Sequence, residues 1–218
     1  MNQTADIKRK RGRPPKTENA DFRDTRETLI TVGLSVLTEK GYSSTGIDEI
    51  LRKAGVPKGS FYHYFVNKEA FGRILIEAYG RYFARKLDRW FEDRALTPLQ
   101  RLEAFVEDAK TGMARFEYRR GCLIGNLGQE MTALPEGFRV LLQDVFTDWE
   151  CRTAGVLREA QQAGEISKDL KCDQMAPFFW INPQNHWIGS PRDFCRYFAA
   201  HDPGRKTTLI TQTRRQHV

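Results

Sequence analysis

The sequence predicts an all-α protein, and three observations point to this fold class. Apolar residues recur at three- and four-residue steps in successive segments, which is the spacing of one face of a helix. No segment shows sustained alternation of apolar and polar residues, the pattern of a half-buried strand. The chain has 218 residues, 40% of them hydrophobic, and can therefore bury a core. We expect packed helices, in one large domain or two small ones.

The N-terminal part predicts three short helices. The first covers residues 24–40, with a capping pair at Asp24 and Glu27 and a stop at Gly41. A second, shorter helical run follows it. The segment 58–65 is dense in aromatic residues and supplies the third helix.

A long helix and further helical segments are expected after these three. Asn67 caps the long helix, which runs toward Trp90. Beyond Pro98 the apolar spacing stays helical, and Pro135 opens another long amphipathic run that stops at Gly164. We therefore expect the larger, C-terminal part of the chain to be helical as well.

The net charge of +7 is concentrated at the two ends of the chain. Residues 1–16 carry six basic groups and one acidic group, residues 192–218 carry six and two, and the stretch between them has a net charge of −2. In the N-terminal arm, Arg11 and Arg13 lie in an Arg-Gly-Arg-Pro sequence that resembles an AT-hook, whose arginines follow a narrow A·T minor groove. The alternative is an unstructured tail that attracts DNA without sequence preference.

Several classes of protein do not fit this composition. No apolar run approaches the ~18–20 residues of a membrane span, and no apolar segment follows the basic N-terminus, so we expect a cytoplasmic protein without a membrane partner. The four cysteines are widely spaced and lie away from the histidines, which argues against a zinc site and a disulfide framework. Because no catalytic triad, phosphate loop or paired-carboxylate motif stands out, we expect neither an enzyme nor a cofactor.

The N-terminal helices have the chemistry of a helix-turn-helix, in which a short helix enters the major groove of DNA while neighbouring elements contact phosphates. Lys58 supplies charge, and Gly59 lets the backbone approach DNA closely. Tyr62 and His63 offer side-chain donors, although both could simply be solvated surface residues. Lys68 adds a cation at the start of the long helix, where backbone N–H groups favour a phosphate.

The segment Gly55-Val56-Pro57-Lys58-Gly59-Ser60-Phe61-Tyr62-His63-Tyr64-Phe65, followed by Asn67-Lys68-Glu69, resembles the signature of TetR-type repressors. The segment 41–50 lies at the expected place upstream, and the match is dense over about residues 25–72. The resemblance implies a homodimer whose N-terminal domains read two half-sites of a palindromic operator. It also implies that larger helical C-terminal domains pair and hold a pocket for a small-molecule inducer.

The resemblance also implies which residues contact DNA. Phosphate contacts are expected from the second and third helices and the start of the long one, and the residues after Pro57 lie nearest the base edges. With the arm included, the candidates are Arg11, Arg13, Ser44, Thr45, Lys58, Gly59, Ser60, Tyr62, His63 and Lys68. Phe61, Tyr64 and Phe65 are expected in the core, because aromatic residues at helical spacing usually pack.

The segment 119–131 is unusual for a plain core helix. Its three glycines weaken a helical conformation, so the segment must bend, or another group must approach its backbone closely. Cys122, Asn126 and Gln129 or Glu130 fall on one helical face, and two upstream arginines raise the local positive potential, which favours a thiolate and could hold an anion. The sensor candidates are Cys122, Asn126, Gln129, Glu130, Arg120 and Trp149.

Within the TetR family, this segment resembles a subgroup for which the inducer is a small unsaturated carboxylate such as acrylate, or another electrophile. A thiolate near cations is a coherent sensor of a Michael acceptor. The alternatives are reversible, non-covalent binding, and a cysteine that is merely a small buried hydrophobic residue.

The C-terminal end departs from the family pattern. TetR-type domains end with two helices that build a four-helix dimer interface, but here the first begins near Asp173 and meets Pro183 within about three turns. The rest of the chain is basic and broken by prolines. Our hypothesis is a frameshifted or recombined end, and the alternative is an ordinary divergent tail.

These observations divide the chain into four parts. They are a basic disordered arm (1–21), a helix-turn-helix DNA-binding domain (22–68), a helical ligand-binding and dimerisation domain (69–181) and a divergent tail (182–218). The predicted function is a ligand-responsive transcriptional repressor that a small inducer releases from its operator. The alternative is an architectural protein that binds DNA non-specifically through its basic arm.

Overall fold

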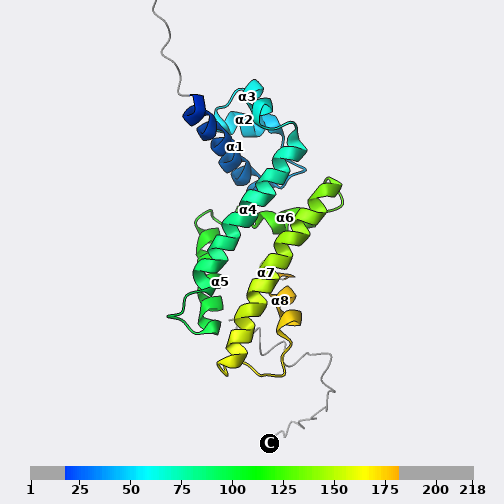
Figure 1. Cartoon of the computed structure of the whole chain (residues 1–218). Helices are drawn as coiled ribbons and strands as arrows, with labels where there is room; N and C mark the ends of the chain where they lie inside the picture. Colours follow the sequence, from blue (N-terminus) through cyan, green and yellow to red (C-terminus); the bar gives the residue numbers. More distant parts are fainter. Residues whose placement is uncertain (1–17, 182–218) are drawn as a thin grey trace, which may run out of the picture.

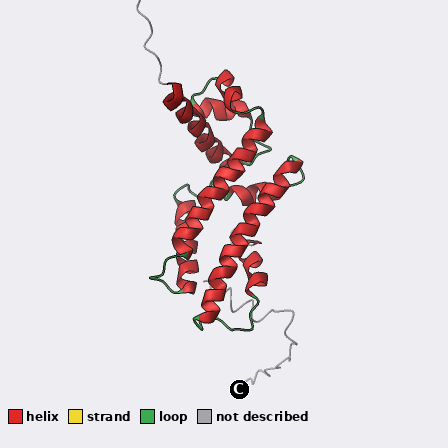
Figure 2. Cartoon of the chain, viewed as in Figure 1, coloured by secondary structure: helices red, strands yellow, loops and turns green. Residues whose placement is uncertain are grey.

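The computed structural model describes residues 18–181, with side chains described for residues 24–180. This part of the chain is built from helices joined by loops (Figure 2), which confirms the all-α prediction. The helices are α1 (Glu18–Lys40), α2 (Ile47–Ala54), α3 (Lys58–Tyr64), α4 (Lys68–Phe91), α5 (Pro98–Ala114), α6 (Leu123–Gln129), α7 (Glu136–Gln162) and α8 (Cys172–Ile181).

Helices α1, α2 and α3 pack together with the start of α4 at one end of the molecule (Figure 1). The centre of this bundle is aromatic: Phe61 and Phe65 of α3 are 0% and 1% exposed, and both rings lie 4.6–5.3 Å from the Phe71 ring of α4. The prediction that Phe61 and Phe65 belong to the core is confirmed, and Tyr64 is partly buried against them. The third helix is thereby fixed on its inner side.

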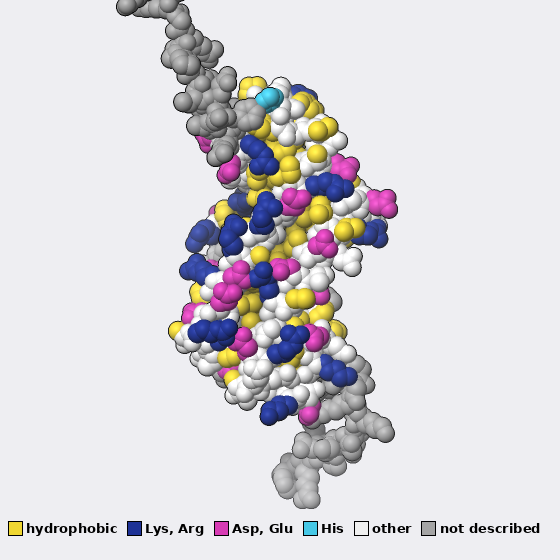
Figure 3. Space-filling model, in the orientation of Figure 1, with side chains coloured by type: hydrophobic (Ala, Val, Ile, Leu, Met, Phe, Trp, Pro, Cys, Tyr) yellow, Lys and Arg dark blue, Asp and Glu magenta, His cyan; other side chains and the backbone are white. Residues whose placement is uncertain are grey.

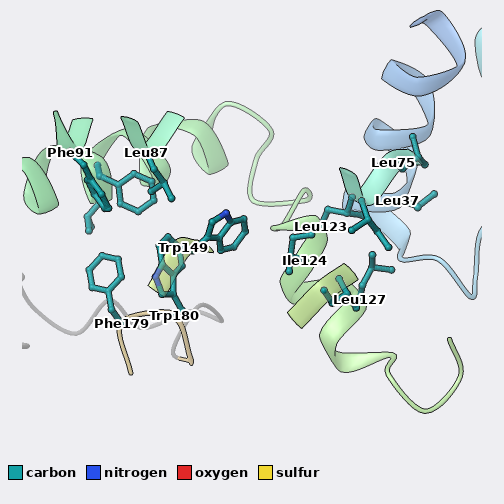
Figure 4. Packing of buried hydrophobic residues seen from close by; sticks show 14 of the residues in the cluster. Leu37, Leu75, Leu87, Phe91, Leu123, Ile124, Leu127, Trp149, Phe179 and Trp180 are labelled. Carbon is teal, nitrogen blue, oxygen red and sulfur yellow. The ribbon is translucent and has the colours of Figure 1, made fainter. Parts of the chain in front are cut away.

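Helix α4 runs without interruption from this bundle into the larger part of the molecule, where α7 lies beside it (Figure 1). The Asn67 side chain accepts a hydrogen bond from the Ala70 amide, which confirms the predicted cap. In the larger part, α5 and α8 complete a core in which the rings of Trp149 and Trp180 lie close together (Figure 4), and the Phe83 ring contacts both.

Two predicted boundaries need correction. Helix α1 begins at Glu18 rather than at residue 24, so residues 18–21 of the predicted arm are helical. Residues 18–23 contain neither proline nor glycine to stop the helix, and the capping pair therefore does not mark its start. The boundary between 68 and 69 falls inside the first turn of α4, which belongs to both parts of the molecule.

Several predictions fall on residues outside the described range. Arg11 and Arg13 of the arm lie there, as does the divergent tail from residue 182. None of the helices within residues 18–181 is long and apolar enough to cross a membrane. The same residues contain no group of three or more histidine, cysteine or acidic side chains arranged to hold a metal ion.

Candidate functional site

The turn between α2 and α3 sets the direction of the third helix. Gly55 ends α2 in the left-handed region, with φ of 65°, and its amide donates to the Arg52 carbonyl. Pro57 then begins α3, and its carbonyl accepts from the Ser60 amide. Glycine readily adopts the left-handed conformation that ends α2, and proline favours the backbone angles found at the start of α3. The connection between the two helices is therefore rigid.

The outer face of α3 carries the side chains that the sequence predicts for DNA contact. Lys58, Gly59 and His63 are exposed, Ser60 is partly exposed, and Tyr62 is 51% exposed. A Cβ atom at Gly59 would meet no atom within 4 Å, so the backbone of α3 is open to close approach there. Donors and a cation thus project from a helix whose opposite face is buried.

Lys58 is paired with an acidic residue of the preceding helix. Its Nζ lies 2.9 Å from Asp48 Oδ1, and this hydrogen bond raises the pKa of Lys58. Both side chains are largely exposed, and an exposed ion pair contributes little net stability. A DNA phosphate can therefore compete with Asp48 for this ammonium group.

The turn between α1 and α2 (residues 41–46) separates two further candidates. Ser44 is exposed, as a phosphate contact requires. Thr45 is only 1% exposed, and its hydroxyl donates to the Gly41 carbonyl at 2.7 Å. The prediction that Thr45 contacts phosphate does not fit this geometry, because both the hydroxyl and the amide of Thr45 are already bonded within the turn.

Lys68 is also bonded within the protein. Its Nζ donates to the Tyr42 carbonyl at 2.8 Å and lies 4.2 Å from the centre of the Tyr42 ring. Burial lowers the pKa of Lys68, although the nearby Glu130 carboxylate opposes this effect. The ammonium group therefore stabilises the α1–α2 turn, and the prediction for Lys68 is corrected accordingly.

The predicted sensor residues do not form one ligand-facing stripe. Asn126 Nδ2 donates to the Thr38 carbonyl at 3.1 Å, and Arg120 Nε donates to Thr38 Oγ1 at 3.1 Å. Glu130 accepts from two amides of the α1–α2 turn. Gln129 is exposed. Three of the six candidates thus bond to α1 or to the α1–α2 turn, because α6 packs against the end of α1.

Cys122 lies at the N-terminal end of α6 and is partly buried. Burial raises the pKa of its thiol. Hydrogen bonds from backbone amides and from Tyr79 lower this pKa, but their effect is smaller than that of burial. The prediction that nearby arginines favour a thiolate is wrong: the Arg120 guanidinium lies 4.3 Å from the Phe116 ring and bonds Thr38, while Arg119 pairs with Glu117.

Two aromatic residues extend the surroundings of Cys122 into the core. The Tyr79 hydroxyl lies within hydrogen-bonding reach of the Cys122 sulfur, and burial raises the Tyr79 pKa well above its ordinary value. The Tyr79 ring stacks on Phe83 at 5.7 Å, and Phe83 lies 4.3 Å from Trp149. Figure 4 shows Trp149 between the aromatic group around Trp180 and the aliphatic residues of α6.

Trp149 differs from its neighbours in its hydrogen bonding. It is 1% exposed, and its Nε1 has no hydrogen-bond partner among the described residues. The Trp180 Nε1, by contrast, donates to Thr153 Oγ1 at 3.0 Å. A buried N–H group without an acceptor is unfavourable by about 1–3 kcal/mol. Among the described residues, the Trp149 indole N–H is therefore a buried donor without an acceptor.

A surface hollow of about 380 Å³ lies at the loop between α6 and α7. None of the predicted sensor residues lines it; its lining residues are Met131, Thr132, Leu134, Pro135, Glu136 and Arg139.

On the face of the body shown in Figure 3, basic and acidic side chains are interspersed, without a continuous basic field.

Sequence reasoning did not single out Tyr42, Thr38 and Tyr79. Thr38 acts through its backbone carbonyl, for which the sequence carries no signal. Tyr79 lies on the apolar face of α4 and looks like an ordinary core residue. Tyr42 follows the helix stop at Gly41, so only its position after a turn sets it apart.

A helix-turn-helix with an exposed polar third helix, joined by one long helix to a larger helical body, defines a DNA-binding regulator. Comparisons with known proteins agree. The family described as bacterial regulatory proteins, tetR family, matches residues 29–71, and the tetracyclin repressor-like C-terminal domain matches residues 98–186.

Individual relatives extend the match over most of the chain. The transcriptional regulator AcuR of Cereibacter sphaeroides is 56% identical over 183 residues, which are 84% of this chain and 81% of that protein. The Escherichia coli repressor NemR is 33% identical over 68% of this chain and 71% of its own length. A crystal structure of a TetR regulatory protein from Rhodobacter sphaeroides is 58% identical, with a TM-score of 0.71 over 72% of this chain and 83% of that one.

The chain therefore belongs to the TetR family of transcriptional regulators, which are DNA-binding proteins and not enzymes. The family resemblance that the sequence predicts is confirmed.

Proposed function

We propose that this TetR-family regulator binds a palindromic operator as a homodimer and leaves it when a small α,β-unsaturated carboxylate, such as acrylate, or another electrophile occupies the region around Cys122. The outer face of α3 supports operator reading, because Lys58 and Tyr62 are exposed there. Phe61 and Phe65 anchor the opposite face in the core. The half-sites of such dimers lie about 34–36 Å apart, so a small change in the spacing of the two α3 helices lowers the affinity.

The donors near Cys122 support this class of inducer. A carbonyl or carboxylate oxygen needs hydrogen-bond donors, and the Tyr79 hydroxyl and the unpaired Trp149 Nε1 lie in the connected aromatic group next to Cys122. In a covalent form of sensing, the Cys122 sulfur bonds to the β-carbon, the C=C π bond breaks, and the thiol proton moves to the α-carbon. Because the pKa of the thiol is raised, this addition is slow, and non-covalent binding is the competing form.

Operator binding at fixed salt tests both parts of the proposal. The operator is selected from a pool of random duplexes, and binding is measured with acrylate, with acrolein, and with propionate as the saturated control. We expect the unsaturated compounds to release the wild-type protein and propionate to leave it bound. A Cys122→Ser variant that responds as the wild type does would exclude the covalent form, and no response to either unsaturated compound would exclude this inducer class.

A matched pair of lysine variants tests the DNA-reading surface. Lys58→Met removes an exposed, acid-paired ammonium from α3, and Lys110→Met removes one from α5. We expect Lys58→Met to weaken operator binding, either evenly with a salt slope reduced by about one, or with relaxed base preference at one position. Lys110→Met should bind as the wild type does. Equal affinities of the two variants would contradict the assignment of α3.

Deletion of residues 1–16 tests the arm. An arm that reads the minor groove should lose discrimination for A·T flanks when it is removed, whereas a tail that only adds charge should lose affinity evenly. If selection yields no preferred sequence, and small molecules have no effect, the architectural alternative replaces the repressor.

A further inference from the structure

We propose that Glu130 is a positioning residue for operator binding: its carboxylate, at the C-terminal end of α6, holds the α1–α2 turn that presents Ser44, and so links the sensor region to the DNA-reading helices. This inference deepens the proposed function and rests on it for the operator. Its contacts, however, are independent of which inducer the protein recognises.

The Glu130 carboxylate is bonded to the turn through both oxygens. Oε1 accepts from the Tyr42 amide at 3.0 Å, and Oε2 accepts from the Ser43 amide at 2.7 Å. Hydrogen bonds to an ionised acceptor are stronger than those between neutral groups. Lys68 completes the arrangement from α4, since its ammonium donates to the Tyr42 carbonyl and is attracted to Glu130.

A second set of bonds joins α6 to the last turn of α1. If α1 continued as a helix, the Tyr42 amide would donate to the Thr38 carbonyl. Instead that amide donates to Glu130, and the Thr38 carbonyl accepts from the Gly121 amide at 2.9 Å and from Asn126 Nδ2 at 3.1 Å. The segment around α6 therefore supplies both partners that the next turn of α1 would have supplied.

Packing also joins the turn to α6 and α7. Gly41 has a φ of 79°, and a Cβ atom there would collide with the Glu130 carboxylate, so glycine permits this approach. The Tyr42 ring is 7% exposed and lies edge-on to the Phe138 ring of α7 at 5.0 Å. The turn is thus held by α4, α6 and α7 together.

The position of α6 explains how these contacts serve regulation. The helix is seven residues long, about 10 Å, with Cys122 at its N-terminal end and Glu130 at its C-terminal end. Leu123, Ile124 and Leu127 are buried, so the helix is firmly packed (Figure 4). A displacement of α6 near Cys122 must therefore move the α1–α2 turn or break its bonds to Glu130, and either event shifts Ser44.

Glu130→Gln tests this link, with Glu136→Gln as the matched control. Glu136 lies nearby at the start of α7, is exposed, and forms no hydrogen bond or ion pair with the turn among the described residues. A glutamine at position 130 removes the charge and places an N–H donor against the turn amides. We expect hydrogen exchange at the Tyr42 and Ser43 amides to accelerate by roughly tenfold or more, and operator affinity to fall on the order of tenfold. Glu136→Gln should change neither quantity.

The two measurements separate the possible failures. Amide exchange needs neither operator nor inducer, so unchanged exchange at both amides in Glu130→Gln overturns the link while leaving the repressor assignment intact. Faster exchange with operator affinity equal to that of Glu136→Gln also overturns the positioning role. A wild-type protein without operator binding contradicts the proposed function instead, whatever the exchange rates.

A second variant keeps the test decisive if Glu130→Gln reduces folding, as measured by circular dichroism. Asn126→Asp places a carboxylate oxygen against the Thr38 carbonyl and leaves the buried leucines of α6 in place. We expect faster exchange at the Gly121 amide, which shares that carbonyl, together with weaker operator binding. Unchanged values for both would overturn the link.

Discussion

Gly72 lies where α4, α7 and the α1–α2 turn meet, and its replacement by alanine tests how tightly these parts are packed. A Cβ atom at Gly72 would lie 2.5 Å from Phe138 Cζ and 2.8 Å from Tyr42 Cε2. Both rings are buried, at 0% and 7% exposure, and neither is the far end of a flexible chain. The added methyl group must therefore displace a ring or separate the helices.

The expected effect combines two opposing contributions. Alanine is favoured over glycine in a helix interior by about 1 kcal/mol. Overpacking a well-packed core is unfavourable by about 1–3 kcal/mol, and two rigid rings place Gly72→Ala at the upper end of that range. We expect a net loss of about 1–2 kcal/mol in the free energy of unfolding. In α5, a Cβ atom at Gly112 would meet nothing nearer than Lys86 Nζ at 3.9 Å, so Gly112→Ala should gain up to about 1 kcal/mol.

Urea unfolding at one fixed protein concentration measures both variants, the concentration being held constant because dimerisation changes apparent stability. Gly72→Ala should have a lower midpoint than the wild type, and Gly112→Ala the same midpoint or a higher one. A Gly72→Ala protein as stable as Gly112→Ala would refute the close packing at this junction.

Three further substitutions give predictions of stability. Asn67→Ala removes the cap of α4 and should lower the free energy of unfolding by about 1 kcal/mol in urea titrations. Thr153→Val leaves the buried Trp180 Nε1 without its acceptor and should cost about 1–3 kcal/mol, seen as a lower thermal midpoint. The hydrogen bond from Arg101 lowers the pKa of Glu159 below its ordinary value of 4.5, so this pair stabilises the fold above that pH and the contribution is lost as the pH falls. Glu159→Gln should therefore be less stable than the wild type at pH 7, and the difference should shrink in unfolding curves recorded below about pH 4.

Much of the fold could be predicted because its helices are marked locally. Glycine favours the left-handed conformation that Gly55 adopts at the end of α2, and asparagine favours the capping position that Asn67 occupies at the start of α4. The inner and outer faces of α3 follow from the spacing of Phe61 and Phe65. The start of α1 was predicted six residues too late, because Asp24 and Glu27 can equally well lie within a helix, where they have no capping role.

The candidate site was harder to predict, because residue type does not reveal which partner each side chain binds. Thr45 has a polar side chain at a plausible DNA-contact position, but its hydroxyl is bonded to Gly41 four residues earlier. Lys68 has the charge that a phosphate needs, but its ammonium group is bonded to the Tyr42 carbonyl of the α1–α2 turn. Residue type and spacing indicate which bonds a side chain can form, whereas the fold determines which partner lies close enough to form them.

The polar residues of segment 119–131 show the same principle at the level of function. Their spacing suggests one face turned toward a ligand, but α6 is too short to present one face to one partner. Its N-terminal end reaches Tyr79 through Cys122, and its C-terminal end reaches the α1–α2 turn through Glu130. Because the two ends are about 10 Å apart, a displacement of the helix at Cys122 would also move Glu130. This geometry gives Asn126 and Glu130 a reason to be polar that requires no ligand: they satisfy the end of α1 that would otherwise be left without partners.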